Sequence, residues 1–317
     1  MESQAAADEL PSPPEISALQ EHVRRCRVVL VRPHYAGNLG AVARIMRNFD
    51  MQDLVLVNPR TTPQDLEARR LAVHGLPILD AARIVPDLGT ALADCVYTLA
   101  TSAETAGLQR RGRIAPPRHL MPRLVQAAAE GPVALVFGPE PHGLTLEEVN
   151  RCHGQIFIPA SPTYPALNLA QAVAICCYEW YIHCQEYATS PRAPHPARQV
   201  ATHAELERMF QHLRQGLEAV GYLFGDRQEV LMSAIRHLLG RAQPTQGEVR
   251  MLHGLARQLL WIARRAGRPL PANTVDEPEM APLTPDFLHP PSSHPDTLGE
   301  HKSLTSETPA NTVEGTG

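Results

Sequence analysis

The chain has 317 residues, of which 44% are hydrophobic and 20% are charged, and its net charge is −4. This length is enough for one large domain and a smaller one, and the apolar content allows a sizeable core. No apolar run reaches the roughly 18 residues that a membrane span needs. The acidic, proline-rich start lacks the basic residues and the apolar run of a secretory signal. We therefore expect a cytoplasmic protein and no contact with a membrane.

The net charge hides an uneven distribution. Residues 1–21 carry −5 and residues 271–317 carry −7, so the stretch between them carries +8. All of the positively charged residues in this stretch are arginines, and the planar guanidinium of arginine binds phosphate and guanine through paired hydrogen bonds. A basic body suits an RNA partner. It equally suits ordinary solubility, so charge alone leaves both interpretations open.

The cysteines do not form a metal-binding pattern. Zinc sites need several ligands at set spacings, and the chain contains no CxxC pair. We expect no metal site, and mostly buried thiols that stay reduced in the cytosol. The six cysteines are Cys26, Cys95, Cys152, Cys176, Cys177 and Cys184.

Apolar runs and helical spacing predict alternating strands and helices in the first part of the chain. Such alternation is typical of an α/β fold with a parallel sheet and helices on both faces. We expect this domain over residues 22–186. Its predicted strands are 27–31, 54–57, 95–100, 133–137 and 155–158, and its clearest helices are 38–49, 145–152 and 168–186.

The second part of the chain has a different pattern. Apolar residues at helical spacing predict a small all-helical domain over residues 200–270. Its first helix carries the stripe Leu206, Met209, Phe210, Leu213 and Leu217, and two more helices are predicted at 229–239 and 246–264. The remaining segments are a proline-rich linker at 187–199 and two acidic stretches expected to be disordered, the leader 1–21 and the tail 271–317.

Four loops follow predicted strands, where parallel sheets bind their ligands. Taken singly, each loop also has a purely structural interpretation. Asn38 and Asn168 could each cap a helix, and Thr145 with Glu148 three residues later could form a capping box. The four loops are residues 32–40, 101–103, 137–145 and 158–168.

Three of these segments together resemble a known family. Asn38–Arg44 (NLGAVAR), Phe137–Leu144 (FGPEPHGL) and Leu167–Val173 (LNLAQAV) are similar, in order and spacing, to the three motifs of SpoU-type methyltransferases of the SPOUT superfamily. The segment from Leu206 to Val249 looks like the C-terminal region of the TrmJ group. The resemblance covers about residues 25–265.

The resemblance implies a trefoil knot at the C-terminal end of the parallel sheet, S-adenosylmethionine bound in the knot, and a homodimer in which both subunits shape each site. It assigns catalysis to Arg44 and gives Asn38, Glu140 and Asn168 the role of supporting the knot loops and the dimer interface. The implied cofactor-binding residues are Thr101, Ser102, Ala103, Gly138, Ile158, Pro165, Ala166 and Leu167.

The implied activity is methylation of a ribose 2′-hydroxyl in RNA, with position 32 of the tRNA anticodon loop, a cytidine or uridine, as the leading substrate. Arg44 is an unusual base, because free arginine has a pKa of about 12.5 or more. It could instead stay charged and stabilise the emerging alkoxide or position a phosphate.

Two alternatives to this activity remain open. The first is the same reaction on ribosomal RNA. The second is an RNA-binding homologue without catalysis, suggested by Glu104 and Ala166, which stand where the family usually has arginine and serine, respectively. Asp50 also departs from the usual glycine.

The helical domain, with ten arginines against six acidic residues, is expected either to contact RNA or to support packing or dimerisation.

Overall fold

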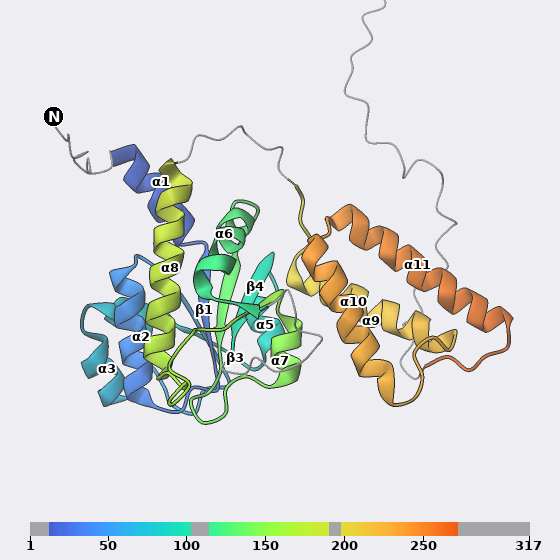
Figure 1. The fold of residues 1–317 in the computed structure, drawn as a ribbon, viewed down its shortest axis with the longest axis horizontal. Helices are drawn as coiled ribbons and strands as arrows, with labels where there is room; N and C mark the ends of the chain where they lie inside the picture. Colours follow the sequence, from blue (N-terminus) through green and yellow to red (C-terminus); the bar gives the residue numbers. More distant parts are fainter. Residues whose placement is uncertain (1–12, 103–113, 190–197, 272–317) are drawn as a thin grey trace, which may run out of the picture. The chain divides into compact units, whose positions relative to one another are not determined.

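A computed structural model describes residues 13–102, 114–189 and 198–271. Within these residues, seven strands form one sheet in the order β3-β2-β1-β6-β4-β7-β5, and every neighbouring pair is parallel (Figure 1). The predicted parallel sheet is therefore confirmed. The strands are β1 (Cys26–Val31), β2 (Asp53–Val57), β3 (Arg83–Val85), β4 (Tyr97–Thr101), β5 (Ile114–Ala115), β6 (Val133–Phe137) and β7 (Gly154–Ile156).

The strands that sequence analysis found are the ones whose residues are mostly or entirely buried. Every residue of β1 and of β6 is buried, which explains their continuous apolar runs. The short strands β3 and β5 were not predicted, because β3 has two exposed residues at a sheet edge and β5 has only two residues. The strand predicted at 95–100 begins at Tyr97, and the one predicted at 155–158 ends at Ile156.

Helices cover both faces of the sheet, as predicted (Figure 1). Val28 and Leu30 of β1 lie in one apolar cluster with residues of α1, α2, α6 and α8. Val29 and Val31 point to the opposite face, where the cluster includes α5 and α7. The helices of this part are α1 (Pro13–Val23), α2 (Ala36–Asn48), α3 (Leu66–Ala72), η1 (Val73–Gly75), α4 (Leu76–Asp80), α5 (Leu88–Leu92), α6 (Pro117–Ala128), α7 (Leu146–Arg151) and α8 (Leu169–Thr189).

Helix α1 corrects the prediction of a disordered leader over residues 1–21. From Pro13 onward the chain is helical, and Leu19 and Val23 are buried against the core. His22 stacks on Tyr187 at 4.5 Å, and Trp180 donates a hydrogen bond to the carbonyl of Val23 at 3.2 Å. Composition alone hid these contacts, because a few apolar residues are enough when they meet the long helix α8.

The second part is all-helical, as predicted. The expected stripe on its first helix is buried, with Leu206, Met209, Phe210 and Leu213 in one apolar cluster and Leu217 packed against it. Capping boxes begin two of the helices, at Thr202 and Thr245. The elements are α9 (His203–Ala219), η3 (Gly225–Arg227), α10 (Gln228–Ala242) and α11 (Gln246–Arg265).

The predicted linker is shorter at its start than expected, because α8 continues through Thr189. Residues 190–197 lie outside the described part of the chain. So does the predicted tail, except for Pro271.

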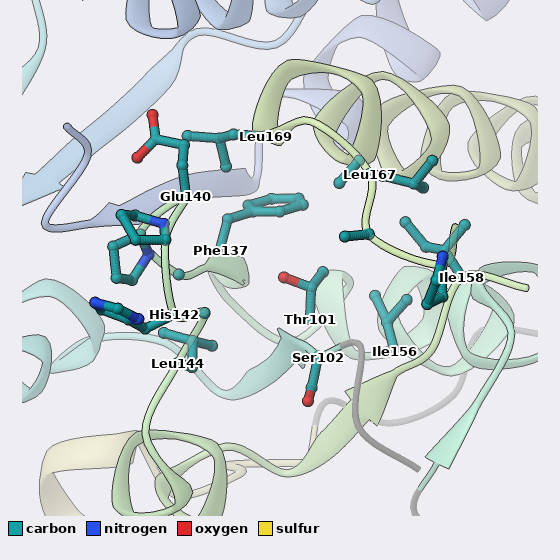
Figure 2. A pocket seen from close by; sticks show the side chains of 17 residues that line it. Thr101, Ser102, Phe137, Glu140, His142, Leu144, Ile156, Ile158, Leu167 and Leu169 are labelled. Carbon is teal, nitrogen blue, oxygen red and sulfur yellow. The ribbon is translucent and has the colours of Figure 1, made fainter. Parts of the chain in front are cut away.

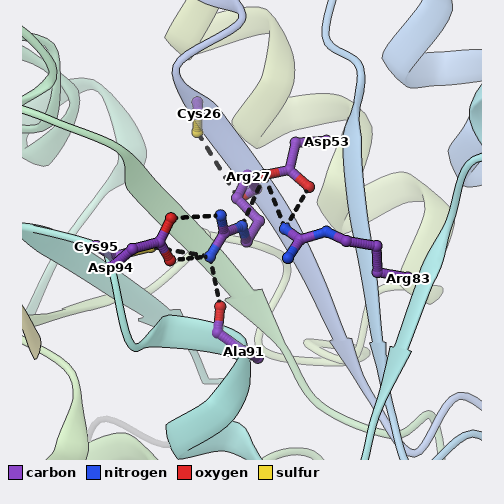
Figure 3. Close-up of polar contacts among 7 residues, drawn as sticks. All are labelled: Cys26, Arg27, Asp53, Arg83, Ala91, Asp94 and Cys95. Atoms are coloured by element: carbon purple, nitrogen blue, oxygen red, sulfur yellow. Dashed lines mark hydrogen bonds and ion pairs between the residues drawn. The ribbon is translucent and has the colours of Figure 1, made fainter. Parts of the chain in front are cut away.

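Arg27 is the one charged residue among the apolar residues of β1. It is buried nevertheless, with only 5% of it exposed. Figure 3 shows its guanidinium between two acids: Nε donates to Asp53 at 2.7 Å, and Nη1 and Nη2 donate to Asp94 at 2.6 and 3.0 Å. Nη1 also donates to the carbonyl of Ala91 at 2.6 Å. Burial alone would lower the pKa of Arg27, but these bonds outweigh it and raise that pKa above its ordinary value. The buried charge is therefore fully paired.

Candidate functional site

The sheet carries a cavity of about 350 Å³ at the carboxyl ends of β4, β6 and β7 (Figure 2). This is the edge where parallel sheets place their ligands, and the volume lies within the usual range for small-molecule sites. The lining residues come from these strand ends and from the loops that follow them: Thr101, Ser102, Phe137, Gly138, Pro139, Glu140, Pro141, His142, Gly143, Leu144, Ile156, Ile158, Pro165, Ala166, Leu167, Leu169 and Ala172.

Most of the side chains that line the cavity are apolar, but its exposed surface as a whole is about as polar as it is apolar. Figure 2 shows Phe137, Leu144, Ile156 and Leu167 around its centre. The hydroxyl of Thr101 is held by donating to the carbonyl of Val136 at 3.1 Å. Such a site suits an organic molecule that buries apolar surface and also makes hydrogen bonds.

Gly138 shows why the first position after β6 has no side chain. A Cβ atom placed there would lie 2.3 Å from the backbone nitrogen of Leu144 and 2.4 Å from the carbonyl carbon of Gly143. Gly143 itself has a φ of +66°, in the left-handed region that favours glycine. The loop 138–145 can therefore fold back tightly on the strand end only with both glycines.

Three polar residues predicted to support the site form one connected network. Glu140 accepts hydrogen bonds from the backbone N–H groups of His34 at 2.9 Å and Tyr35 at 3.3 Å, and from Nδ2 of Asn38 at 2.9 Å. Oδ1 of Asn38 in turn accepts from Nδ2 of Asn168 at 2.9 Å. The Glu140 carboxylate is directed away from the cavity (Figure 2), so it fixes the surrounding loops to one another.

The helix-capping interpretations had mixed outcomes. The capping box of Thr145 and Glu148 is present at the start of α7. Asn168 accepts a hydrogen bond from the backbone N–H of Ala170 at the start of α8. Asn38 does not cap α2, because that helix already begins at Ala36 and the Asn38 side chain is used in the network with Glu140.

The structure brings together most of the residues expected to bind a cofactor. Thr101, Ser102, Gly138 and Ile158 line the cavity, as do Pro165, Ala166 and Leu167. Ala103 and Glu104 lie outside the described residues. Arg44 is not part of the cavity wall; it is exposed on α2, which starts beside the network.

Sequence analysis missed several residues that line the cavity. Phe137 and Ile156 could have been found, because each is the last residue of an apolar strand and strand ends form the ligand edge. Leu144 and Ala172 lie in the segments Phe137–Leu144 and Leu167–Val173, but the resemblance did not assign them to the cofactor. Arg32, which pairs with Glu148 across two loops, was also missed, since the partners are 116 positions apart.

No group of three or more metal-ligating side chains occurs within residues 13–102, 114–189 and 198–271. In the same ranges, no helix combines the length and the apolar character required to cross a bilayer. All six cysteines are buried, as predicted, and none of them is disulfide-bonded.

Two family signatures match the chain. The SpoU rRNA Methylase family matches residues 25–178, and the C-terminal domain of the tRNA methyltransferase TrmJ matches residues 204–269. The first contains the cavity and its network, and the second coincides with helices α9 to α11.

Similar proteins cover most of the chain. A protein of Pectobacterium atrosepticum named tRNA (cytidine/uridine-2′-O-)-methyltransferase TrmJ is 37% identical over 229 residues, 72% of this chain and 94% of that protein. The protein of the same name from Escherichia coli O6:K15:H31 is 37% identical over 239 residues, 74% of this chain and 94% of that protein. The crystal structure of TrmJ from Z. mobilis ZM4 has a TM-score of 0.62 and 31% identity, covering 74% of this chain and 98% of that one. The chain belongs to the SpoU methylase family, and its two matched regions place it among the TrmJ proteins of that family.

Proposed function

We propose that the chain transfers a methyl group from S-adenosylmethionine to a ribose 2′-hydroxyl of tRNA, at the cytidine or uridine in position 32 of the anticodon loop. The observation that carries this proposal is the cavity at the ends of β4, β6 and β7, whose loops are joined by the Glu140–Asn38–Asn168 network. The names of the TrmJ relatives support the tRNA substrate and the choice of cytidine or uridine.

The cavity fits the cofactor by its chemistry. A wall that is part apolar and part polar, lined without polar side chains at Gly138 and at Pro165–Leu167, suits a nucleoside, which has an apolar base face and hydrogen-bonding edges. S-Adenosylmethionine, when bound, supplies a methyl group on a positively charged sulfur. Thr101, Ser102, Ile158 and, from outside the described residues, Ala103 would complete its binding site.

The reaction then needs three things from the chain: the 2′-hydroxyl must lose its proton, approach the methyl group in line, and be shielded from water. We assign the first task to Arg44, acting as base or as stabiliser of the emerging alkoxide. Because Arg44 lies outside the cavity wall of its own subunit, we propose that a homodimer brings it to the site of a second copy.

We propose the remaining features on the same basis. The knotted path of the family fits loops 138–145 and 158–168 around the cavity. The chain would divide into a methyltransferase domain ending with α8, a linker, and the helical domain 200–270, which would bind RNA. The protein would act in the cytoplasm, where its tRNA substrate is found.

The first test is calorimetry of the full chain with S-adenosylmethionine, followed by methyl transfer to unmodified tRNA and mapping of the methylated ribose. Binding and a 2′-O-methyl group at position 32 are expected. A methyl group found only in ribosomal RNA would redirect the substrate assignment. Absence of cofactor binding would instead favour an RNA-binding homologue, consistent with the departures at Glu104 and Ala166.

The second test concerns Arg44. We expect Arg44→Ala to keep the fold and the cofactor affinity and to lower methyl transfer by roughly 10²–10³-fold, the usual effect of removing a group that stabilises developing charge. Arg47→Ala, which removes another exposed arginine one turn along α2, is the matched control. Wild-type turnover in Arg44→Ala would exclude the role given to this residue.

A further inference from the structure

Loop 138–145, which forms one wall of the cavity, is tied to the segment 32–38 at two places. One is the bonding of Glu140 described above. The other is an ion pair between Arg32, the first residue after β1, and Glu148 in the first turn of α7. We propose that Arg32 and Glu148 are positioning residues that lock loop 138–145 in its cofactor-binding shape; the cofactor part of this inference rests on the proposed function.

The pair has the geometry of a specific contact. Nη1 of Arg32 donates to Oε1 of Glu148 at 2.6 Å, and Nη2 donates to Oε2 at 3.0 Å. The guanidinium therefore binds the carboxylate through two parallel hydrogen bonds. The side chain of Glu148 is only 14% exposed and that of Arg32 is 29% exposed. This burial distinguishes the pair from that of Arg151 with Glu147 on the same helix, because the side chain of Glu147 is 76% exposed.

The backbone of Arg32 is held in place as well. Arg32 has a φ of +47°, a left-handed conformation that side chains other than glycine rarely adopt. Its N–H donates to the carbonyl of Val57 at 2.8 Å, and its own carbonyl is 2.8 Å from Nδ1 of His34. A strained residue held by several contacts is typical of functional loops.

Glu148 connects the ion pair to the end of the loop. Its carboxylate accepts a hydrogen bond from the N–H of Thr145 at 2.8 Å, and Thr145 directly follows Leu144 of the cavity wall. Burial alone would raise the pKa of Glu148, but the bonds from Arg32 and Thr145 outweigh it and lower that pKa. In turn, hydrogen bonding to Glu148 raises the pKa of Arg32 above its ordinary value. Both groups are thus held in their charged forms.

The two carboxylates therefore bind the same segment from opposite ends of the loop. Glu140 holds the start of the loop in place, and Glu148 holds its end in place. Between them, Gly138 packs against Leu144 and Gly143 with no room for a side chain. A small shift at the end of the loop, near Thr145, would move Leu144 relative to Gly138 and change the shape of the cavity wall.

The test compares Arg32→Asn, Glu148→Gln and the double variant in the full-length protein. Asparagine tolerates the left-handed conformation of position 32, and glutamine can still serve the capping box, so each change removes mainly the ion pair. Glu147→Gln is the matched control on the same helix, because its ion pair is exposed and does not reach segment 32–38. The readouts are the dissociation constant for S-adenosylmethionine, the split between KM for this cofactor and kcat, and hydrogen exchange of residues 138–145 without ligand.

We expect each single variant to weaken cofactor binding about tenfold, and the double variant to be no weaker than either single one, because the pair acts as a unit. KM for the cofactor should rise while kcat is retained. Hydrogen exchange of loop 138–145 should become faster in these variants and stay unchanged in Glu147→Gln. Wild-type affinity and wild-type exchange in Arg32→Asn would overturn the inference.

The outcomes separate this inference from the proposed function. If the wild-type chain does not bind S-adenosylmethionine, the proposed function fails, and the hydrogen exchange of the unliganded loop still decides whether the ion pair holds it. Faster exchange would support the positioning role, and unchanged exchange would refute it.

Discussion

Gly138 is the residue at which the cavity tolerates no added atom. We predict that Gly138→Ala weakens S-adenosylmethionine binding at least about tenfold, because the new Cβ would meet backbone atoms of Gly143 and Leu144, which cannot rotate away. Calorimetry measures this effect. Gly247→Ala is the control: its Cβ would meet only ordinary contacts, and alanine favours the helix there. Wild-type affinity in Gly138→Ala would show that the loop relaxes at no cost.

Asp94 gives the stability of the chain a predictable pH dependence. The hydrogen bonds from Arg27 hold the pKa of Asp94 below its ordinary value. The lowered pKa means that Asp94 adds stability above about pH 4, its unfolded range, and that this stability is lost as the pH falls through the lower folded value.

We therefore predict that Asp94→Asn has a lower melting temperature than the wild type at pH 6, and that the difference narrows as the pH falls below about 4. Melting curves between pH 3 and pH 6 measure it. Asp226→Asn, which removes a carboxylate at an exposed position in η3, is the control. A constant difference for Asp94→Asn at all pH values would contradict the ionic origin of its effect.

At the scale of elements, α1 should contribute measurable stability, because it covers part of α8. Leu19 is 7% exposed within the main apolar cluster. We predict that Leu19→Ala lowers the free energy of unfolding by about 2–3 kcal/mol. Ser17→Ala, at an exposed position of the same helix, should change it by no more than about 0.5 kcal/mol. Denaturant unfolding measures both, and equal values would mean that α1 is not docked in solution.

The elements that sequence analysis found and missed differ in how local their stabilising contacts are. The buried strands β1 and β6 and the amphipathic helix α9 carry their own patterns, so they were predicted. Helix α1 depends on Trp180 and Tyr187, which lie more than 150 positions away. Strand β3 depends on pairing with β2 at the sheet edge. No local pattern records such contacts.

The site could be predicted only in part, for a related reason. The rule that ligands bind at strand ends located the loops, and the family resemblance supplied the individual residues. The bond between Asn38 and Asn168 spans 130 positions and that between Asn38 and Glu140 spans 102. Spacing alone gives no distance between such residues. The pair of Arg32 and Glu148 was missed because Glu148 was recognised only as part of a capping box, and Arg32 lies 116 positions away from it.

At the scale of the whole molecule, the exposed position of Arg44 leads to a prediction about subunits. The test uses a heterodimer of one Arg44→Ala subunit and one Gly138→Trp subunit, purified through two different tags. If each site combines the cavity of one subunit with Arg44 of the other, this heterodimer has one site in which both parts are intact. We expect about half of the wild-type activity per dimer. If Arg44 serves the cavity of its own subunit, the heterodimer would be inactive. Each homodimeric variant is the inactive control.

The six buried cysteines give the whole molecule a reporter of its own opening. Burial raises the pKa of Cys95 and of Cys177 to about 12, so neither thiol reacts with an alkylating reagent in the closed protein. Labelling of these thiols then requires the fold to open, and its rate follows the population of open molecules when closing is faster than labelling. A ligand that binds only the folded chain lowers that population by the factor one plus its concentration over its dissociation constant. Thiol labelling therefore yields ligand affinities without an activity assay.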